Sequence, residues 1–385
     1  MPDDEPQWQK KCRNFSLQEI LIMPFDRGSF AFTMFELPDD VPEDFIELFA
    51  ARRAGTLDSV TGDPQIGWVT GHGLLDTNID GASAQLGGCY YLTLRQAVRK
   101  IPNSLLAALC RREEQAVMRA EGKEYLSGKQ KREIKEDMME KHLSKMPPSL
   151  SGIPFVLEPH SRMLYVGATS NAQIDLFIEN FYQAVQSDPL MLTPELILER
   201  EFKTTGANFP ALSIDGRTAA EPSIGRDFLM YLWYYGETVG KLQHPDYGEF
   251  DLMIEGPLVF SGDDDDRGSA ETTVKKGGSP LRSAEAKAAV SVGKKLKKAK
   301  LTITRLNQIW SGTFDADRFV FTGFKLPEGE EMNDDEIFAE RIQNLGIFRE
   351  ALIGYFKLFA DAMLGDNFAK TEKAVRDWAN SRDAI

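Results

Sequence analysis

The pattern of apolar and polar residues predicts a chain that mixes strands with helices. Short runs rich in aromatic and β-branched residues predict strands at 30–37, 67–69 and 89–95. Apolar residues three and four positions apart predict a helix at 173–185, and residues 41–51 form a second candidate helix with acids in its first turn. The predicted fold class is therefore α+β, with α/β lobes built from mixed sheets and flanking helices.

The segment 102–148 has a different pattern. Pro102 opens a stretch of strong helix formers, and Ser127-Gly128 divides it into two predicted helices. Their apolar stripe is thin, and charges of both signs surround it. Because a thin stripe buries little surface, we predict a charged helical hairpin that projects as an arm and ends near Met146.

The second half of the chain repeats the mixture of strands and helices. Aromatic residues at helical spacing in 226–236 favour a helix that packs on a core over a helix that stacks on bases. The remaining candidate strands are 250–254, 258–260, 300–305, 308–314 and 318–326, and the remaining candidate helices begin near 283, 335 and 371.

These elements predict four parts. Residues 1–101 together with 149–200 form the first α/β lobe, and residues 102–148 form the helical hairpin. Residues 201–330 form a second α/β lobe, and residues 331–385 form C-terminal helices. A chain of 385 residues is long enough for two or three such cores.

Charge is distributed very unevenly. The net charge is −14, yet residues 271–305 contain ten basic residues and only two acids. The basic residues are Lys275, Lys276, Arg282, Lys287, Lys294, Lys295, Lys297, Lys298, Lys300 and Arg305. A row of flexible ammonium groups neutralises phosphates without reading bases, so we favour sequence-independent DNA contact here. A solvated helix that keeps an acidic protein soluble, and a scaffold that binds an acidic protein partner, are the alternatives.

Most catalytic classes find no support in the sequence. The three cysteines and four histidines have no metal-ligand spacing, and neither a Walker motif nor a nucleophile elbow is present. No apolar run reaches transmembrane length and no signal core is visible, so we expect a reduced, cytoplasmic protein without a membrane partner. We predict no cofactor and no metal.

One acidic pattern keeps an enzymatic alternative open. Asp263 to Asp266 precede Glu285-Ala-Lys287, the order in which many restriction-type nucleases present their Mg²⁺ ligands. In such enzymes the Glu-x-Lys element lies on a buried strand, whereas Ser283 and the alanines after it predict the start of a helix. A Mg²⁺-dependent exonuclease that uses Asp265 or a neighbouring aspartate, Glu285 and Lys287 is therefore the second hypothesis.

The order of elements resembles the bacterial RdgC family, in the long variant found in phages and diverse bacteria. In the first half, the resemblance rests on Gly67-Trp68-Val69, a strand ending near Arg95, Ile101-Pro102, the Lys/Glu-rich hairpin and the strand at 163–166. In the second half, it rests on the aromatic helix, the Lys275-Lys276 loop, Gly293-Lys294 and the segment 310–327.

This resemblance implies a horseshoe-shaped subunit, two copies of which close into a homodimeric ring around double-stranded DNA. It implies nucleoid association, binding without sequence preference, and modulation of recombination by competition with RecA-type filaments. The family carries an exonuclease name, but the ring is thought to act by binding.

The resemblance also implies individual contacts. The family's basic loop falls on Lys275 and Lys276, although its glutamine is replaced here by Gly277. A family lysine before the next strand falls on Lys298 or Lys300, with Lys294, Lys295 and Lys297 as neighbours. At a ring junction the family arginine is absent, and Leu150 takes the place of its phenylalanine, so Met146 and Leu150 are the candidate dimer contacts.

Overall fold

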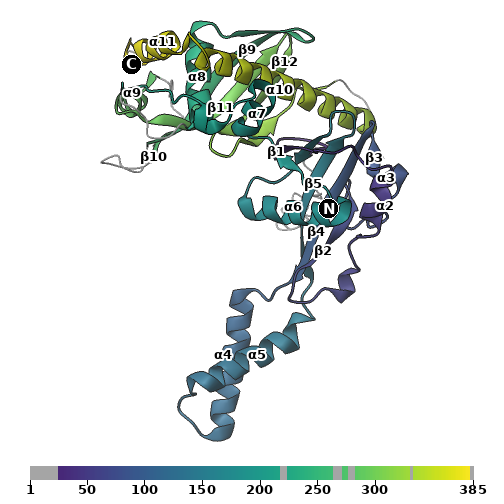
Figure 1. Ribbon diagram of the computed structural model, residues 1–385. Coiled ribbons are helices and arrows are strands. Elements are labelled where there is room, and N and C mark those ends of the chain that lie inside the picture. The colour runs from purple at the N-terminus through teal and green to yellow at the C-terminus, as the bar shows by residue number, and fades with distance from the viewer. Residues whose placement is uncertain (1–24, 217–222, 263–270, 276–281, 330–332, 382–385) are drawn as a thin grey trace, which may run out of the picture.

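The computed structural model describes residues 25–216, 223–262, 271–275, 282–329 and 333–381 (Figure 1). Its strands form one thirteen-stranded sheet in the order β10-β9-β11-β12-β13-β1-β6-β5-β4-β2, with β3 on β4, β7 on β1 and β8 on β9. The strands are β1 Phe30–Glu36, β2 Gln65–Thr70, β3 Gln85–Leu86, β4 Cys89–Arg99, β5 Pro148–Glu158, β6 Met163–Val166, β7 Leu190–Met191, β8 Lys241–His244, β9 Gly248–Ser261, β10 Glu271–Val274, β11 Lys295–Arg305, β12 Gln308–Asp315 and β13 Val320–Lys325.

Ten α-helices are present in the described part of the chain, which confirms the α+β class. They are α2 Phe45–Ala50, α3 Gly81–Ala84, α4 Asn103–Glu121, α5 Gly128–Leu143, α6 Asn171–Val185, α7 Pro194–Phe202, α8 Ile224–Thr238, α9 Ala284–Ser291, α10 Asp334–Met363 and α11 Phe368–Ser381. Helix α2 begins at Phe45, after Pro42 and an Asp44 cap, and is shorter than the predicted 41–51.

The two halves of the chain share one sheet, whereas the sequence pattern predicted separate mixed sheets. Strand β1 makes the connection, because Thr33 pairs with Val320 of β13 on one side and with Val166 of β6 on the other. All twelve pairings between the named strands are antiparallel. The horseshoe outline and the division into four parts stay predictions.

Helix α10 covers one face along the length of this sheet (Figure 1). Near its start, the ring of Phe338 stacks on Tyr91 of β4 with 4.8 Å between centroids. In its middle, the backbone carbonyl of Asn344 accepts a 2.8 Å hydrogen bond from the indole of Trp310 in β12. Near its end, the hydroxyl of Tyr355 donates to backbone carbonyls beside β9. The aromatic helix α8 is buried on the same core, as its spacing predicted.

The opposite face is covered over part of its width. Helices α2 and α6 bury an aromatic cluster that includes Phe49, Trp68, Phe155 and Phe177. The strands in this cluster are β1, β2, β4, β5, β6 and β7. Farther along the sheet on β9 and β12, Met253 and Ile309 are 55% and 54% exposed. Within the described chain, the β9-β11-β12 part of this face is therefore open to solvent.

The helical hairpin is confirmed and projects from the body (Figure 1). Gly122 ends α4 at φ +63°, in the left-handed region where glycine carries no steric penalty. Ser127 then caps α5 through a reciprocal capping box with Gln130. The arm has a small core of its own around Ile134 and Met138, as expected for a thin apolar stripe.

Candidate nucleic-acid interface

Strand β11 holds five of the ten basic residues of the segment, and its burial pattern determines what each of its lysines can do. The sequence placed the strand at 300–305, but it begins at Lys295 and pairs with β9 and β12. Leu301 and Ile303 point into the core beneath α8 and α10. Because side chains alternate in a strand, Lys300 and Thr302 point toward the opposite, open face. Shifts in the register with β9 occur on both sides of Lys298 and break the alternation among the earlier lysines.

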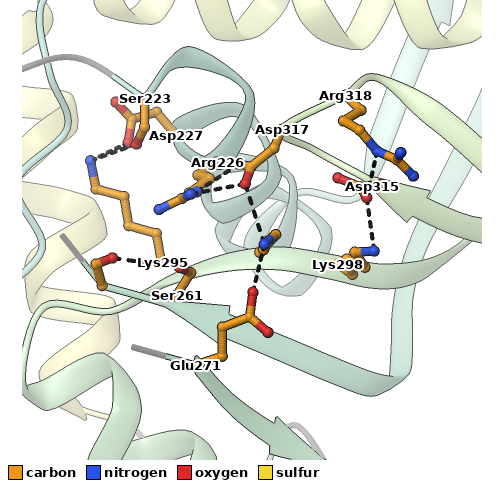
Figure 2. A network of polar contacts seen from close by, with 12 residues as sticks. Ser223, Arg226, Asp227, Ser261, Glu271, Lys295, Lys298, Asp315, Asp317 and Arg318 are labelled. Carbon is orange, nitrogen blue, oxygen red and sulfur yellow. Dashed lines mark hydrogen bonds and ion pairs between the residues drawn. The ribbon is translucent and has the colours of Figure 1, made fainter. Parts of the chain in front are cut away.

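The first two lysines are held inside the subunit. Lys294 is only 8% exposed, and its Nζ lies 3.0 Å from Oγ1 of Thr272 on β10. The Nζ of Lys295 lies 2.5 Å from Oδ1 of Asp227, a fully buried residue in the first turn of α8 (Figure 2). These two ammonium groups connect β11 to the core elements around it.

Lys297 belongs to a second network within the subunit. Its partners Glu271 and Asp317 are labelled in Figure 2. Its Nζ lies 2.5 Å from a carboxylate oxygen of Glu271 and 3.8 Å from Asp317, which also receives two hydrogen bonds from Arg226. The hydrogen bond that Lys297 donates to Glu271, more than the attraction of the nearby carboxylates, raises the pKa of Lys297 above its ordinary value. Lys297 is therefore charged, but its charge is compensated within the subunit.

Lys298 and Lys300 are the lysines of β11 that reach solvent on the open face. Each side chain is 37% exposed. Lys298 lies 2.8 Å from Asp315, and Arg318 lies 3.4 Å from the same carboxylate. Lys300 lies 2.7 Å from Glu255. Both lysines thus stand at the surface, each with one carboxylate beside it.

Hydroxyl groups continue this surface across the neighbouring strands. Thr313 of β12 pairs with Lys300, and Ser311 pairs with Thr302 on one side and Lys325 on the other. The open sheet face is the set Glu255, Lys298, Lys300, Thr302, Ser311, Thr313, Asp315, Thr322 and Lys325. Of these, Thr302 and Asp315 are buried. Lys325 at the end of β13 and Arg318 before its start were missed from the sequence because they lie outside the lysine-rich segment. Their positions within the strand predicted at 318–326 were the available signal.

Two predicted contacts lie at or beyond the end of β10. Lys275 directly follows the strand and is exposed. Lys276 lies outside the described residues. The predicted pair is therefore only half placed.

The nuclease residues are also only partly described. Asp263 to Asp266 lie outside the described residues. Glu285 and Lys287 are exposed on α9, where Ser283 caps the helix by accepting a hydrogen bond from the amide of Ala286. The helix predicted at this point is confirmed. In the part of the chain that the structure describes, no group of three potential metal-ligating residues occurs.

The candidate dimer contacts lie at the base of the hairpin. The backbone carbonyl of Met146 accepts a hydrogen bond from Arg99. Leu150 is in β5 opposite Ala97 and packs partly against the main core. Both side chains remain partly accessible, so both can contribute to a surface.

Residues 35–199 match the family model described as "Putative exonuclease, RdgC". Over this region, which is less than half of the chain, the sequence is similar to the RdgC family. This similarity supports a broad role connected with DNA recombination. The matched region runs from β1 to α7 and ends before β11, so it does not contain the open sheet face. No curated protein matches the chain. None of the described helices is both long enough and apolar enough to cross a membrane.

Proposed function

We propose that this protein binds double-stranded DNA without sequence preference, through phosphate contacts on the open sheet face. The observation that carries the proposal is the presence of Lys298 and Lys300 on an uncovered, hydroxyl-rich sheet surface. Ammonium and hydroxyl groups donate to phosphate oxygens and position a duplex without reading its bases. Lys275, Lys276 and Lys325 extend the proposed contact.

The lysines of β11 have two different roles in this proposal. Lys294, Lys295 and Lys297 fix the strand by internal contacts, whereas Lys298 and Lys300 contact DNA. Lys295 is held against the fully buried Asp227 and gains little from a phosphate, because leaving its partner would strand a buried charge. Lys300 and Glu255 are both partly exposed, so this lysine can exchange its carboxylate for a phosphate at low cost. Asp315 beside Lys298 is only 6% exposed, but Arg318 remains 3.4 Å from it when Lys298 turns to a phosphate.

The assembly and the cellular role belong to the same proposal. Two copies form a ring, with Met146 and Leu150 at one junction, and the ring holds duplex DNA in the nucleoid. DNA inside the ring is then less accessible to a RecA-type recombinase. The protein thus modulates recombination by competing with the recombinase for DNA. The family match supports this role, and the exposed ammonium groups of Lys298, Lys300 and Lys325 support a phosphate partner.

An exonuclease is the second candidate function, because the description of the matched family includes that activity. It would use Glu285, Lys287 and the acidic run before them with Mg²⁺. Incubation of end-labelled duplex with Mg²⁺ separates the two functions. Binding alone predicts intact DNA, whereas digestion that Glu285→Gln abolishes would establish the nuclease.

The proposed binding is tested with two duplexes of equal length and unrelated sequence. Fluorescence anisotropy in a salt series should give equal affinities, with log K falling linearly as log salt rises. A large difference in affinity between the duplexes, or no binding at low salt, would contradict the proposal.

A further inference from the structure

Arg95 is a buried charge at the other end of the sheet from β11. It lies in β4 and is 1% exposed. Its cross-strand partners are both glycines, Gly67 in β2 and Gly152 in β5. A Cβ at Gly152 would come within 2.5 Å of Leu74, so glycine lets the loop that carries Leu74 lie directly over this part of the sheet. The guanidinium is thus enclosed between two sheet glycines and a covering loop.

Within the described chain, the acceptors of the guanidinium are all neutral. It donates to the carbonyl of Gly55 at 2.5 Å, to the carbonyl of Leu74 at 3.3 Å and to Oε1 of Gln65 at 3.0 Å. Its Nε has no hydrogen-bond partner among the residues that the structure describes. No described carboxylate forms an ion pair with Arg95, and burial lowers its pKa. A buried guanidinium without a counter-charge is costly, because neutral acceptors replace only part of its hydration.

A cavity of about 670 Å³ adjoins this charge. Arg95 lines it together with Gly55, whose carbonyl accepts from the guanidinium. Arg53, an exposed second cation, lies on its wall. The side chains of Thr56, Thr77 and Asn78 add polar groups. The cavity therefore combines two arginines with neutral hydrogen-bonding groups.

We propose that this cavity is a phosphate-binding site. A phosphate oxygen at its floor would supply the counter-charge that Arg95 lacks, and Arg53 would contact the same anion from the rim. Guanidinium groups suit phosphate because their planar, forked donors match its oxygens. The site is independent of the open sheet face, since five strands lie between β4 and β11 in the sheet order. The phosphate belongs either to a free nucleotide or to a DNA end.

Calorimetric titration of the full chain with inorganic phosphate tests the site, with sodium chloride holding the ionic strength constant. We expect saturable binding of one phosphate per subunit. Arg95→Met should weaken it at least tenfold, and Arg53→Gln at least threefold. Arg162→Gln removes an exposed arginine paired with Asp40 and is the control that should not change it.

Circular dichroism establishes whether Arg95→Met folds. If this variant is unfolded, phosphate binding by Arg53→Gln alone tests the site. Absence of saturable phosphate binding, or binding unchanged in the folded variants, would contradict the proposal. Arg95 would then have only a structural role, in which it holds the loops of Gly55 and Leu74 against the sheet. Two further ligands identify the source of the phosphate. Tighter binding of dAMP than of deoxyadenosine points to a nucleotide, and a preference for 5′-phosphorylated over 5′-hydroxyl duplex that Arg53→Gln removes points to a DNA end.

Discussion

The Nζ of Lys300 lies 2.7 Å from Oε2 of Glu255, its partner on the adjacent strand. The same oxygen accepts a 2.8 Å hydrogen bond from the hydroxyl of Thr302. Lys298 and Asp315 repeat this arrangement on the other side of β11. Lys298 and Lys300, which carry the proposed DNA contact, therefore each have a carboxylate that competes with phosphate.

Neutralising Glu255 should strengthen DNA binding. Glu255→Gln frees Lys300 from its carboxylate and removes a negative charge that repels phosphate. Since exposed ion pairs contribute about 0.2–1 kcal/mol, we expect an affinity roughly two- to fivefold higher. Fluorescence anisotropy with one duplex, used for both proteins, measures the two affinities.

Glu201→Gln is the matched control, because Glu201 pairs with Lys357 at 2.6 Å and both side chains are similarly exposed. Lys357 lies on α10, which covers the other face of the sheet. An equal gain in both variants would show that only the net charge matters and would contradict competition at Lys300.

The Asp227–Lys295 pair should contribute to stability. Asp227→Asn leaves the ammonium of Lys295 in a nearly buried site with its anionic partner removed. Loss of one partner from a buried pair costs about 3–5 kcal/mol, so the free energy of unfolding should fall by about that amount. Urea unfolding measures it. A loss below about 1 kcal/mol, similar to that of Glu201→Gln, would mean that solvent reaches the pair.

Asp26 should make stability depend on pH. Burial, the largest cause, raises the pKa of Asp26 despite opposing contributions from His72, Tyr91 and Arg341. The folded state therefore retains this proton to a higher pH than the unfolded state, whose carboxyl titrates near about 4. As the pH rises from the unfolded-state pKa through the folded-state pKa, the contribution of Asp26 to the free energy of unfolding therefore falls.

Asp26→Asn removes this titration. The variant should gain stability relative to the unmodified protein at pH 7, and the gain should shrink at pH 4. Urea unfolding at the two pH values provides the comparison. A stability difference that is the same at both would assign the effect to lost contacts.

Local patterns were sufficient to predict the elements, but not the partners of the charged residues. The hairpin followed from helix-forming residues and a Ser-Gly break, which act within a few positions of the chain. The lysines of β11 formed a single basic run in the sequence, whereas their carboxylate partners lie far along the chain. Asp227 and Glu255 approach only when α8 and β9 pack beside β11. Only the fold could separate internal lysines from surface lysines.

Arg95 shows the same limit in a different form. In the sequence it is a polar residue within a strand, typical of an exposed position. Its burial depends on glycines in two neighbouring strands and on a loop that lies over them. Those relationships are set by strand register, which the local pattern does not reveal.

DNA affinity of the Lys298→Gln/Lys300→Gln double variant, measured by anisotropy over a salt series, tests the central claim most directly. Loss of two phosphate contacts should reduce the slope of log K against log salt by about 2 and should weaken binding at low salt. Lys357→Gln, which removes a similarly exposed and paired lysine on α10, should leave the slope nearly unchanged. A folded double variant with the affinity and salt slope of the unmodified protein would contradict DNA binding on the open sheet face.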